Sequence, residues 1–448
     1  MTISDLSRQD ILDLSRETTL YEWTAQSAMK PLVIDHASGI YFWDVDGKRY
    51  MDFNSQLMCV NIGHGDKRVI DAVKAQMDQL CYVAPTVATT AVRAELGRLL
   101  KEITPGNLSK AFFTNGGAEA NENAIKIARM FTGRNKIIAR YRSYHGATAG
   151  AMTLTGDPRR WAAEPGIPGV VRAMDPYHYR CRWCGDKPAC TMDCLNNIED
   201  VIMFEGPQTI AAVIVESVVG TNGIIIPPDG YMQGLRDLCT KHGILLICDE
   251  VMSGFGRTGE WFAVNHWGIT PDIMTMAKGL TSAYVPLGAT MVTDTIADYF
   301  EDHPLYAGLT YNAHAVGCAA AVACINVYKE DHLIENARTL GVVLKSELEQ
   351  LKERHPSVGD VRAIGLFSLV ELVKNRETRE PMTPYNPKAN EMGPMPQFNA
   401  FLREHGLFTF VRWNNFFVNP PLCINEQQLR EGLAIIDQAL EITDRAVA

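Results

Sequence analysis

The strongest constraint on the fold is a pattern between residues 60 and 325, where short apolar runs alternate with amphipathic stretches. The clearest apolar runs are AFFT at 111–114, KIIARY at 136–141, IAAVIVE at 210–216 and ILLICDE at 244–250. Apolar strands that alternate with crossover segments favour βαβ units and a mainly parallel sheet. The sequence therefore predicts an α/β fold with a mainly parallel central sheet and helices on both of its faces.

A second, smaller α/β domain is expected after residue 325, where the pattern changes. LIENARTLGVVLKSELEQLKERH has leucines at helical spacing, and VRAIGLFSLVELV and LFTFVRW each have the composition of a strand. Asn425 and Gln428 form a capping pair for a final helix. We expect an N-terminal segment that joins the small domain, a large domain and a small C-terminal domain, at 1–59, 60–325 and 326–448.

Charge and hydropathy exclude several classes of partner. The net charge is −10 at pH 7 and no basic cluster is present, which argues against a nucleic acid or an anionic membrane as partner. The sequence contains no apolar run of about 18 residues, and its N-terminus is too charged for a signal peptide. Most of the 11 cysteines lie in apolar segments, which favours reduced thiols over disulfides. We expect a cytoplasmic protein.

Three apolar runs have a polar side chain at the same end. Glu216 closes IAAVIVE, Asp249 follows ILLIC and Lys278 follows DIMTMA. The carboxyl ends of parallel strands meet at one edge of a sheet, where ligands bind, so these groups are expected at one site. An apolar setting favours a lowered pKa and a reactive amine for Lys278, although a lysine that reaches solvent from a strand end is the alternative.

The same edge is expected to hold an anion and a planar ring. The run AFFT is followed by Asn115, Gly116 and Gly117 and then by a helical stretch, so backbone N–H groups would face the crevice. Tyr144 and His145 follow KIIARY and offer aromatic faces for stacking. A phosphate site, a stacking face, a buried acid and an amine nucleophile together predict pyridoxal phosphate as cofactor.

Six longer stretches are more specific than any single residue. They are FFTNGGAEANENAIKIAR, YHGAT, VIVESVVGTNGIIIPPDGY, LLICDEVMSGFGRTGEWFA, PDIMTMAKGLTSAYVPLGA and GLTYNAHAVGCAAA. Together they resemble the class III aminotransferases of fold type I, over nearly the whole chain. The resemblance implies the pyridoxal-phosphate transferase fold, with 60–325 as the cofactor-binding domain.

The resemblance also implies how the phosphate is held. Gly117 and Ala118 match the phosphate-binding pair, although many relatives have a serine in place of Gly116 or Ala118. Thr310 matches a threonine that contacts the phosphate of the neighbouring subunit. This match implies a homodimer, or a dimer of dimers, with shared active sites.

Around the cofactor ring, the family pattern assigns five further positions. Lys278 matches the lysine that bonds to the cofactor aldehyde and moves the substrate proton, and Asp249 matches the partner of the pyridine nitrogen. Tyr144 matches the stacking tyrosine, Val251 the apolar support under the ring, and Glu216 the acid beside the cofactor. No metal is expected there.

The substrate side of the site is less determined by the sequence. FNSQLMCVNIGHG resembles the branch that takes β-alanine, taurine or other amines as donors and commonly pyruvate as acceptor, although Met58 stands where a tryptophan is expected. Trp23 and Tyr82 are candidate pocket aromatics or ordinary core residues. Arg412 is the candidate for a mobile arginine that binds the keto-acid carboxylate, with a surface ion pair as the alternative.

The expected reaction is a ping-pong transfer of an amino group from an ω-amino acid or amine to a keto acid. A pyridoxal-phosphate decarboxylase or aminomutase would use the same Lys278 and Asp249, so these residues do not separate the three activities. A non-catalytic binding protein would have no use for the lysine and the two acids together.

Two further motifs suggest other ligands. GFGRTG at 254–259 fits G-x-G-x-x-G, but it neither follows a strand directly nor opens a long helix, so a nicotinamide cofactor is not expected. The spacing C-x2-C-x5-C-x3-C of Cys181, Cys184, Cys190 and Cys194 fits either a structural metal site or a cysteine-rich surface loop. The spacing is tight for a zinc ribbon, so we expect the loop.

Overall fold

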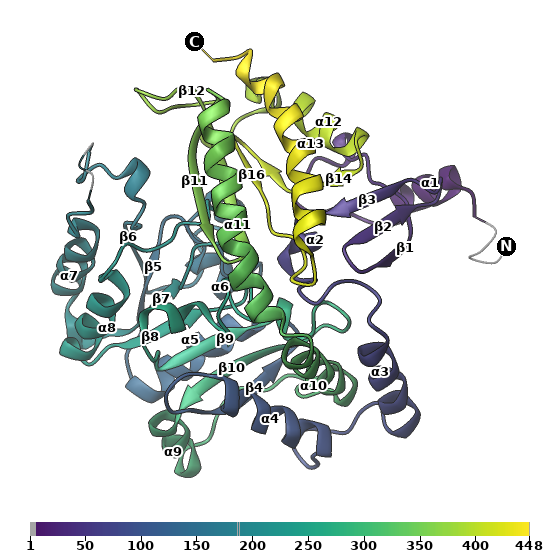
Figure 1. Ribbon diagram of the computed structural model, residues 1–448. Helices are drawn as coiled ribbons and strands as arrows, with labels where there is room; N and C mark the ends of the chain where they lie inside the picture. Colours follow the sequence, from purple (N-terminus) through teal and green to yellow (C-terminus); the bar gives the residue numbers. More distant parts are fainter. Residues whose placement is uncertain (1–5, 186, 188, 448) are drawn as a thin grey trace.

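The computed structural model describes residues 6–185, 187 and 189–447. The expected N-terminal segment begins, and the expected C-terminal domain ends, in residues outside this description, 1–5 and 448. Figure 1 shows the central sheet with helices around it, and the N-terminal strands close to the last helices of the chain. Among the described helices, none combines the length and the hydropathy that a membrane-spanning segment needs.

The central sheet has seven strands in the order β4-β10-β9-β8-β7-β5-β6. In that order they are Leu108–Thr114, Gly288–Thr293, Ile273–Met276, Leu245–Asp249, Ile210–Glu216, Lys136–Arg140 and Val170–Ala173. Strands β5 to β9 pair in parallel, whereas β10 is antiparallel to both of its neighbours. The sheet is therefore mainly parallel, as the sequence predicts.

Helices cover both faces of this sheet because successive strand residues point to opposite sides. On β8, Leu245 and Ile247 pack in a cluster with α5, α6 and α9, whereas Leu246 and Cys248 pack in a cluster with α4, α7, α8 and α10. These helices are α4 Ala91–Ile103, α5 Gly117–Thr132, α6 Ala149–Leu154, α7 Asp193–Glu205, α8 Tyr231–His242, α9 Asp294–Asp302 and α10 Ala315–Glu330. Helix α3, Lys67–Gln79, packs on α10.

The N-terminal and C-terminal parts of the chain share a small sheet, β1-β2-β3-β14. Its strands are Ile34–Ser38, Tyr41–Asp44, Arg49–Asp52 and Leu407–Phe408, and β3 pairs in parallel with β14. A second sheet, β11-β12-β16-β15 with β13 at β12, comprises Val358–Ile364, Phe367–Asn375, Asn415–Phe417, Val411–Arg412 and Glu380–Pro381. The remaining helices are α1 Arg8–Thr18, α2 Ser55–Met58, α11 Leu333–Arg354, α12 Met395–Glu404 and α13 Glu426–Asp444, and the Asn425 capping box begins α13 as predicted.

Two segments expected to be single strands are divided in the structure. VRAIGLFSLVELV turns back on itself between β11 and β12 at Gly365, whose φ of +57° favours glycine. LFTFVRW is divided between two sheets, because Phe408 bonds to Phe53 beside β3 whereas Phe410 bonds to Phe417 of β16. The prediction of one strand was wrong at both places.

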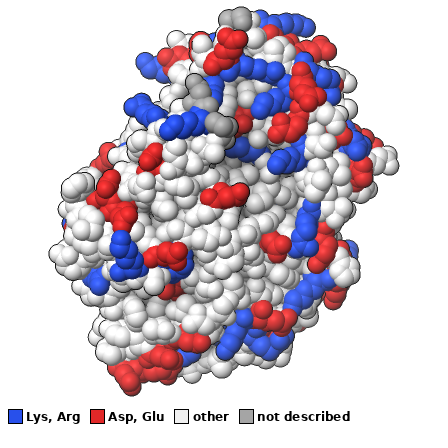
Figure 2. Space-filling model, turned by 60° about the vertical axis from the view of Figure 1, so that its left-hand side comes forward, with Lys and Arg blue, Asp and Glu red and all other residues white. Residues whose placement is uncertain are grey.

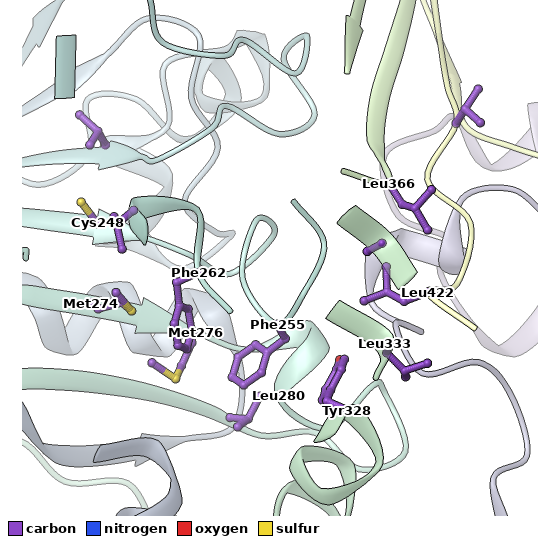
Figure 3. Packing of buried hydrophobic residues seen from close by; sticks show 14 of the residues in the cluster. Cys248, Phe255, Phe262, Met274, Met276, Leu280, Tyr328, Leu333, Leu366 and Leu422 are labelled. Atoms are coloured by element: carbon purple, nitrogen blue, oxygen red, sulfur yellow. The ribbon is translucent and has the colours of Figure 1, made fainter. Parts of the chain in front are cut away.

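One hydrophobic core connects the central sheet with the C-terminal part. Figure 3 shows Met276 and Phe262 beside Phe255, and Tyr328 between this group and Leu333. At the surface, Figure 2 shows acidic and basic side chains close together around a wide area without charged residues.

Candidate active site

The carboxyl ends of β7, β8 and β9 bring the predicted polar groups to one cavity. Glu216 and Asp249 are register partners at the last positions of β7 and β8, and Lys278 lies two residues after the end of β9. All three side chains line a cavity of about 420 Å³. This volume is in the range that holds a small cofactor and part of a substrate.

Lys278 is held in a position that favours a neutral amine. It begins a short 3₁₀ turn with a φ of +45°, a strained conformation for a residue with a side chain. Burial lowers the pKa of its amine, and the nearby Cys59, Glu216 and Asp249 oppose that effect only in part. Within the described part of the chain, the amine has no hydrogen-bond or ion-pair partner, which leaves it available as a nucleophile.

Asp249 is fixed by three neighbours. Its Oδ2 accepts a hydrogen bond from Asn121 Nδ2 at 2.8 Å and lies 2.8 Å from His145 Nδ1, and its Oδ1 accepts from the Val251 N–H at 3.0 Å. Asn121 is oriented in turn by the Thr275 hydroxyl, which donates to Asn121 Oδ1 at 2.8 Å. The carboxylate is therefore buried, oriented and turned toward the cavity.

The N-terminus of α5 forms the expected anion-binding wall. Gly116, Gly117 and Ala118 line the cavity, and no side chain caps this helix end, so its first N–H groups are left for a ligand. A Cβ at Gly117 would lie 2.8 Å from Cγ1 of Val251, so the close packing of the helix end on Val251 requires glycine.

Glu216 and Tyr144 are joined through the backbone. Glu216 accepts hydrogen bonds from the N–H groups of Tyr144 at 3.0 Å and Gly220 at 2.8 Å, and burial raises its pKa. The Tyr144 ring lines the cavity, with the edge of Trp23 at 6.1 Å between ring centroids and the guanidinium of Arg159 at 3.7 Å from its centroid.

The expected substrate residues lie at different distances from this cavity. Met58 is buried beside Met252, a cavity-lining residue, whereas Trp23 is 55% exposed at the edge of Tyr144. Tyr82 donates a hydrogen bond to the Thr310 carbonyl at 2.7 Å, and neither residue lines the cavity of this chain. The structure therefore brings Met58 and Trp23 near the cavity and places Tyr82 with Thr310 elsewhere.

Arg412 lies beside a pair of residues that sequence reasoning missed. Its Nη2 is 3.2 Å from Oδ2 of Asp157, and the same carboxylate binds Arg159. The segment GDPRRW contains an acid and two arginines within four residues, and this local charge cluster is the only signal that the sequence offers there. Asn121, another missed residue, was within the quoted NGGAEANENAIKIAR stretch.

The two motifs for other ligands take no part in this cavity. GFGRTG forms turns without a following α-helix, and Arg257 within it is buried and bonds to Ser55 and Asn61. The described residues contain no group of three or more His, Cys, Asp or Glu side chains arranged to hold a metal ion. In the cysteine segment, Cys184 and Cys190 have their sulfur atoms 3.8 Å apart and both thiols are free.

The family model of the class III aminotransferases matches residues 23–440. The chain belongs to the class III aminotransferases. This class III aminotransferase is 34% identical to the taurine–pyruvate aminotransferase of Bilophila wadsworthia over 459 aligned positions, which cover 98% of each protein. It is a transaminase that uses pyridoxal phosphate, an amine donor and a keto acid.

Solved structures of transaminases have the same fold. The taurine:2-oxoglutarate aminotransferase of Bifidobacterium kashiwanohense, solved with pyridoxal phosphate and glutamate, has a TM-score of 0.94 and 44% identity over 99% of this chain and 100% of its own. An (S)-enantioselective ω-transaminase of Thermomicrobium roseum has a TM-score of 0.92 and 36% identity over 97% and 99%. This aminotransferase therefore has the fold of pyridoxal-phosphate-dependent class III transaminases.

The cavity of this aminotransferase fits pyridoxal phosphate on its own geometry. The uncapped N-terminus of α5 suits the phosphate, and the cavity lies between the Tyr144 ring and Val251, whose close packing on Gly117 fixes the cavity wall. The bound group supplies an electron-withdrawing ring that takes up the electron pair of a broken substrate bond. Its aldehyde requires an unprotonated amine, which is what burial favours at Lys278.

Proposed function

We propose that this aminotransferase moves an amino group from an ω-amino acid, taurine or a similar amine to a keto acid by a ping-pong mechanism. The observation that carries the proposal is the meeting of an unpaired lysine and an oriented carboxylate, Lys278 and Asp249, in one buried cavity. Two half-reactions then share the cavity, because the donor product leaves before the keto acid binds.

In this proposal the amine of Lys278 has two tasks. It would hold the cofactor through its aldehyde, and it would move the proton at the substrate carbon. The Asp249 carboxylate would pair with the pyridine nitrogen of the cofactor. The bonds from Asn121 and His145 keep that carboxylate oriented toward the cavity.

The remaining cavity residues position the cofactor. The N–H groups of Gly117 and Ala118 bind the phosphate, with Gly116 as the N-cap residue of α5. Tyr144 and Val251, which both line the cavity, would pack against the cofactor ring. Glu216 orients Tyr144 through its backbone N–H.

The donor and acceptor classes rest on the relatives and on Arg412. Two relatives are named for taurine, one with pyruvate and one with 2-oxoglutarate as acceptor. Arg412 binds the keto-acid carboxylate in this proposal, and its single hydrogen bond to Asp157 leaves most of its N–H groups available. Met58 and Trp23 are further substrate contacts in this proposal, and the Trp23 ring centroid lies 5.4 Å from the guanidinium of Arg159.

The assembly is proposed as a homodimer with shared sites. Thr310 is exposed and lies in a region with exposed large apolar side chains, which suits an interface. They are Tyr82, which bonds to the Thr310 carbonyl, and Tyr306 and Tyr311, which are close to Thr310 along the chain. From that interface Thr310 reaches the cofactor phosphate of the partner subunit.

The domain division is likewise a proposal. The parallel pairing of β3 with β14 supports the assignment of segment 1–59 to the small C-terminal domain, 326–448. The cavity residues from Asn115 to Leu287 all belong to 60–325, which supports this part as the cofactor-binding domain.

A panel of donors and acceptors tests the activity. Taurine, β-alanine, propylamine and the α-amino acid 2-aminobutyrate are each offered with or without pyruvate or 2-oxoglutarate, and alanine or glutamate is measured as the product. Keto-acid-dependent consumption of a donor supports transfer, whereas release of CO₂ or isomerisation of the donor without a keto acid would identify a decarboxylase or an aminomutase. Borohydride reduction followed by peptide mapping should label Lys278, and label on another lysine would refute its role.

A further inference from the structure

A buried carboxylate beside the cavity holds two guanidinium groups. The Asp157 side chain is fully buried, with 0% exposure, and contacts both Arg159 and Arg412. One negative charge therefore faces two positive charges. Glu22, another acid whose charge is close enough to raise the pKa of Tyr144, is exposed to solvent. The cluster has a surplus positive charge next to the cavity.

Arg159 is the fixed member of this pair. Its Nε donates to Asp157 Oδ2 at 2.9 Å, its Nη2 donates to Thr221 Oγ1 at 2.9 Å, and its guanidinium stacks on the Tyr144 ring. Thr221 and Tyr144 both line the cavity, so Arg159 is anchored to two cavity-wall residues. Arg159 also acts on Lys278, since its charge helps to lower the pKa of that amine.

The two arginines keep unused donors toward a ligand. Nη1 of Arg159, and Nε and Nη1 of Arg412, make no hydrogen bond to any described residue. The Arg412 side chain is only 11% exposed, yet its spare donors and Nη1 of Arg159 are not among the buried polar atoms that lack a partner, so they remain accessible to a ligand. Accessible guanidinium donors can form charge-assisted hydrogen bonds with a bound anion.

We propose that Arg159, anchored by Asp157 and Thr221, is a fixed anion-binding site at the cavity wall that selects amine donors with a sulfonate or carboxylate group. Arg412 binds the carboxylate of the keto acid, and Arg159 binds the acid group of the donor. This inference rests on the proposed function and names its donor class. A different arginine then binds the substrate anion in each half-reaction, Arg159 for the donor and Arg412 for the keto acid.

The binding of an amine-free anion tests this site directly. Ethanesulfonate and propionate, which are taurine and β-alanine without the amino group, are titrated calorimetrically into the cofactor-loaded enzyme. Arg159→Gln should weaken binding by about tenfold or more, because charge-assisted bonds are lost, and Arg159→Lys should retain part of the affinity. Loss for only one of the two anions identifies sulfonate or carboxylate as the preferred group.

A neighbouring arginine provides the matched control. Arg160 pairs with Glu164 and its Nε donates to the Gly156 carbonyl at 3.2 Å, so Arg160→Gln should leave ethanesulfonate binding unchanged. Equal affinity of wild type and Arg159→Gln for both anions, or binding of neither anion by wild type, would overturn the proposal. If Arg159→Gln does not fold, Thr221→Val removes one anchor and should still weaken binding; unchanged affinity there would count against the site.

Donor selectivity separates this inference from the proposed function. In single turnovers, Arg159→Gln should lower the ratio of kcat/KM for taurine to kcat/KM for propylamine by about tenfold or more. An unchanged ratio in an active transaminase would refute the anion site alone. Anion binding that depends on Arg159, in an enzyme that transfers no amino group from any donor, would refute the proposed function alone.

Discussion

Asp157 and Arg412 meet across 255 residues of chain, with Oδ2 of the acid 3.2 Å from Nη2 of the arginine. The acid follows helix α6, which packs on the central sheet, whereas the arginine is the last residue of β15 in the C-terminal sheet. Burial of Arg412 and its repulsion from Arg159 lower the pKa of Arg412. A single bond of this kind can be exchanged for a substrate carboxylate without leaving Asp157 unpaired, because Arg159 remains bound to it.

Substitution Arg412→Ala should therefore affect the keto-acid half-reaction most. We expect a higher KM for pyruvate and a loss of about 2 to 4 kcal/mol in kcat/KM, since a charge-assisted pair with the carboxylate is removed. Stopped-flow measurement of each half-reaction separates the two effects. Equal losses with propylamine and with pyruvate, or no loss with either, would place the carboxylate site elsewhere.

Substitution Asp249→Ala should slow proton removal from the donor by several orders of magnitude, because it removes the side chain that would pair with the pyridine nitrogen. Some cofactor should remain bound, since the phosphate site at α5 is intact. The rate is measured in a single turnover with saturating donor. Thr275→Val is the milder comparison, because it removes only the hydroxyl that orients Asn121; near-normal turnover in Asp249→Ala would contradict the role of Asp249.

The contribution of Lys278 to the stability of the apoenzyme should become more favourable as the pH rises toward the ordinary pKa of lysine. Burial lowers the pKa of Lys278 below its usual 10.5, so between the two values the unfolded chain binds the extra proton. Stability rises with pH wherever the unfolded state binds more protons. Urea unfolding of cofactor-free protein at about pH 7 and about pH 9.5 measures the change in the free energy of unfolding.

Lys278→Met is the matched control for this titration, because it keeps the length of the side chain and removes the amine. The difference in unfolding free energy between wild type and Lys278→Met should shrink as the pH rises. A constant difference would show that the amine is not desolvated in the folded chain.

Thr310→Ala should weaken cofactor binding only in a subunit that faces the substituted partner. Mixed dimers of a Thr310→Ala chain and a Lys278→Ala chain are informative. If the sites are shared, such a dimer has one unsubstituted site and one site with both substitutions. If the sites are not shared, each site has one substitution. Cofactor affinity is measured by absorbance after dialysis and separation of the mixed species. Affinity that is independent of how the subunits are paired would contradict a shared site.

The cysteine segment should contain no stoichiometric metal. Metal analysis by mass spectrometry after dialysis against a chelator measures zinc per chain, and a Cys184→Ser variant serves as comparison. Zinc at about one per chain in wild type, lost in Cys184→Ser, would make this segment a structural metal site.

The central sheet was largely predictable, because its buried parallel strands are continuous apolar runs. Strand β10 was not expected, since GATMVT has two threonines and a glycine and lacks a long apolar run. It completes the sheet between β4 and β9 as its only antiparallel member among the described strands. Its place depends on tertiary pairing, which periodicity along the chain does not encode.

The catalytic end of the cavity was also predictable, because strand ends place Glu216, Asp249 and Lys278 at one edge. The side chains around Asp157 were not, since Arg159 and Arg412 meet only after two distant segments pack together. The sequence around Arg412 was moreover interpreted as one strand, whereas β14 and β15 belong to different sheets. Short strands in mixed sheets carry too few residues for a period to be recognised.

The parallel pair of β3 and β14 sets an order on how the chain can mature during synthesis. Strand β3 is made early, but its partner at Leu407–Phe408 emerges only when almost the whole protein has been translated. Until then the edge of β3 stays without its partner strand, and such edges are prone to pair with other chains. A chain whose synthesis ends before β14 would contain every strand of the central sheet, but its N-terminal sheet would lack the strand that pairs with β3.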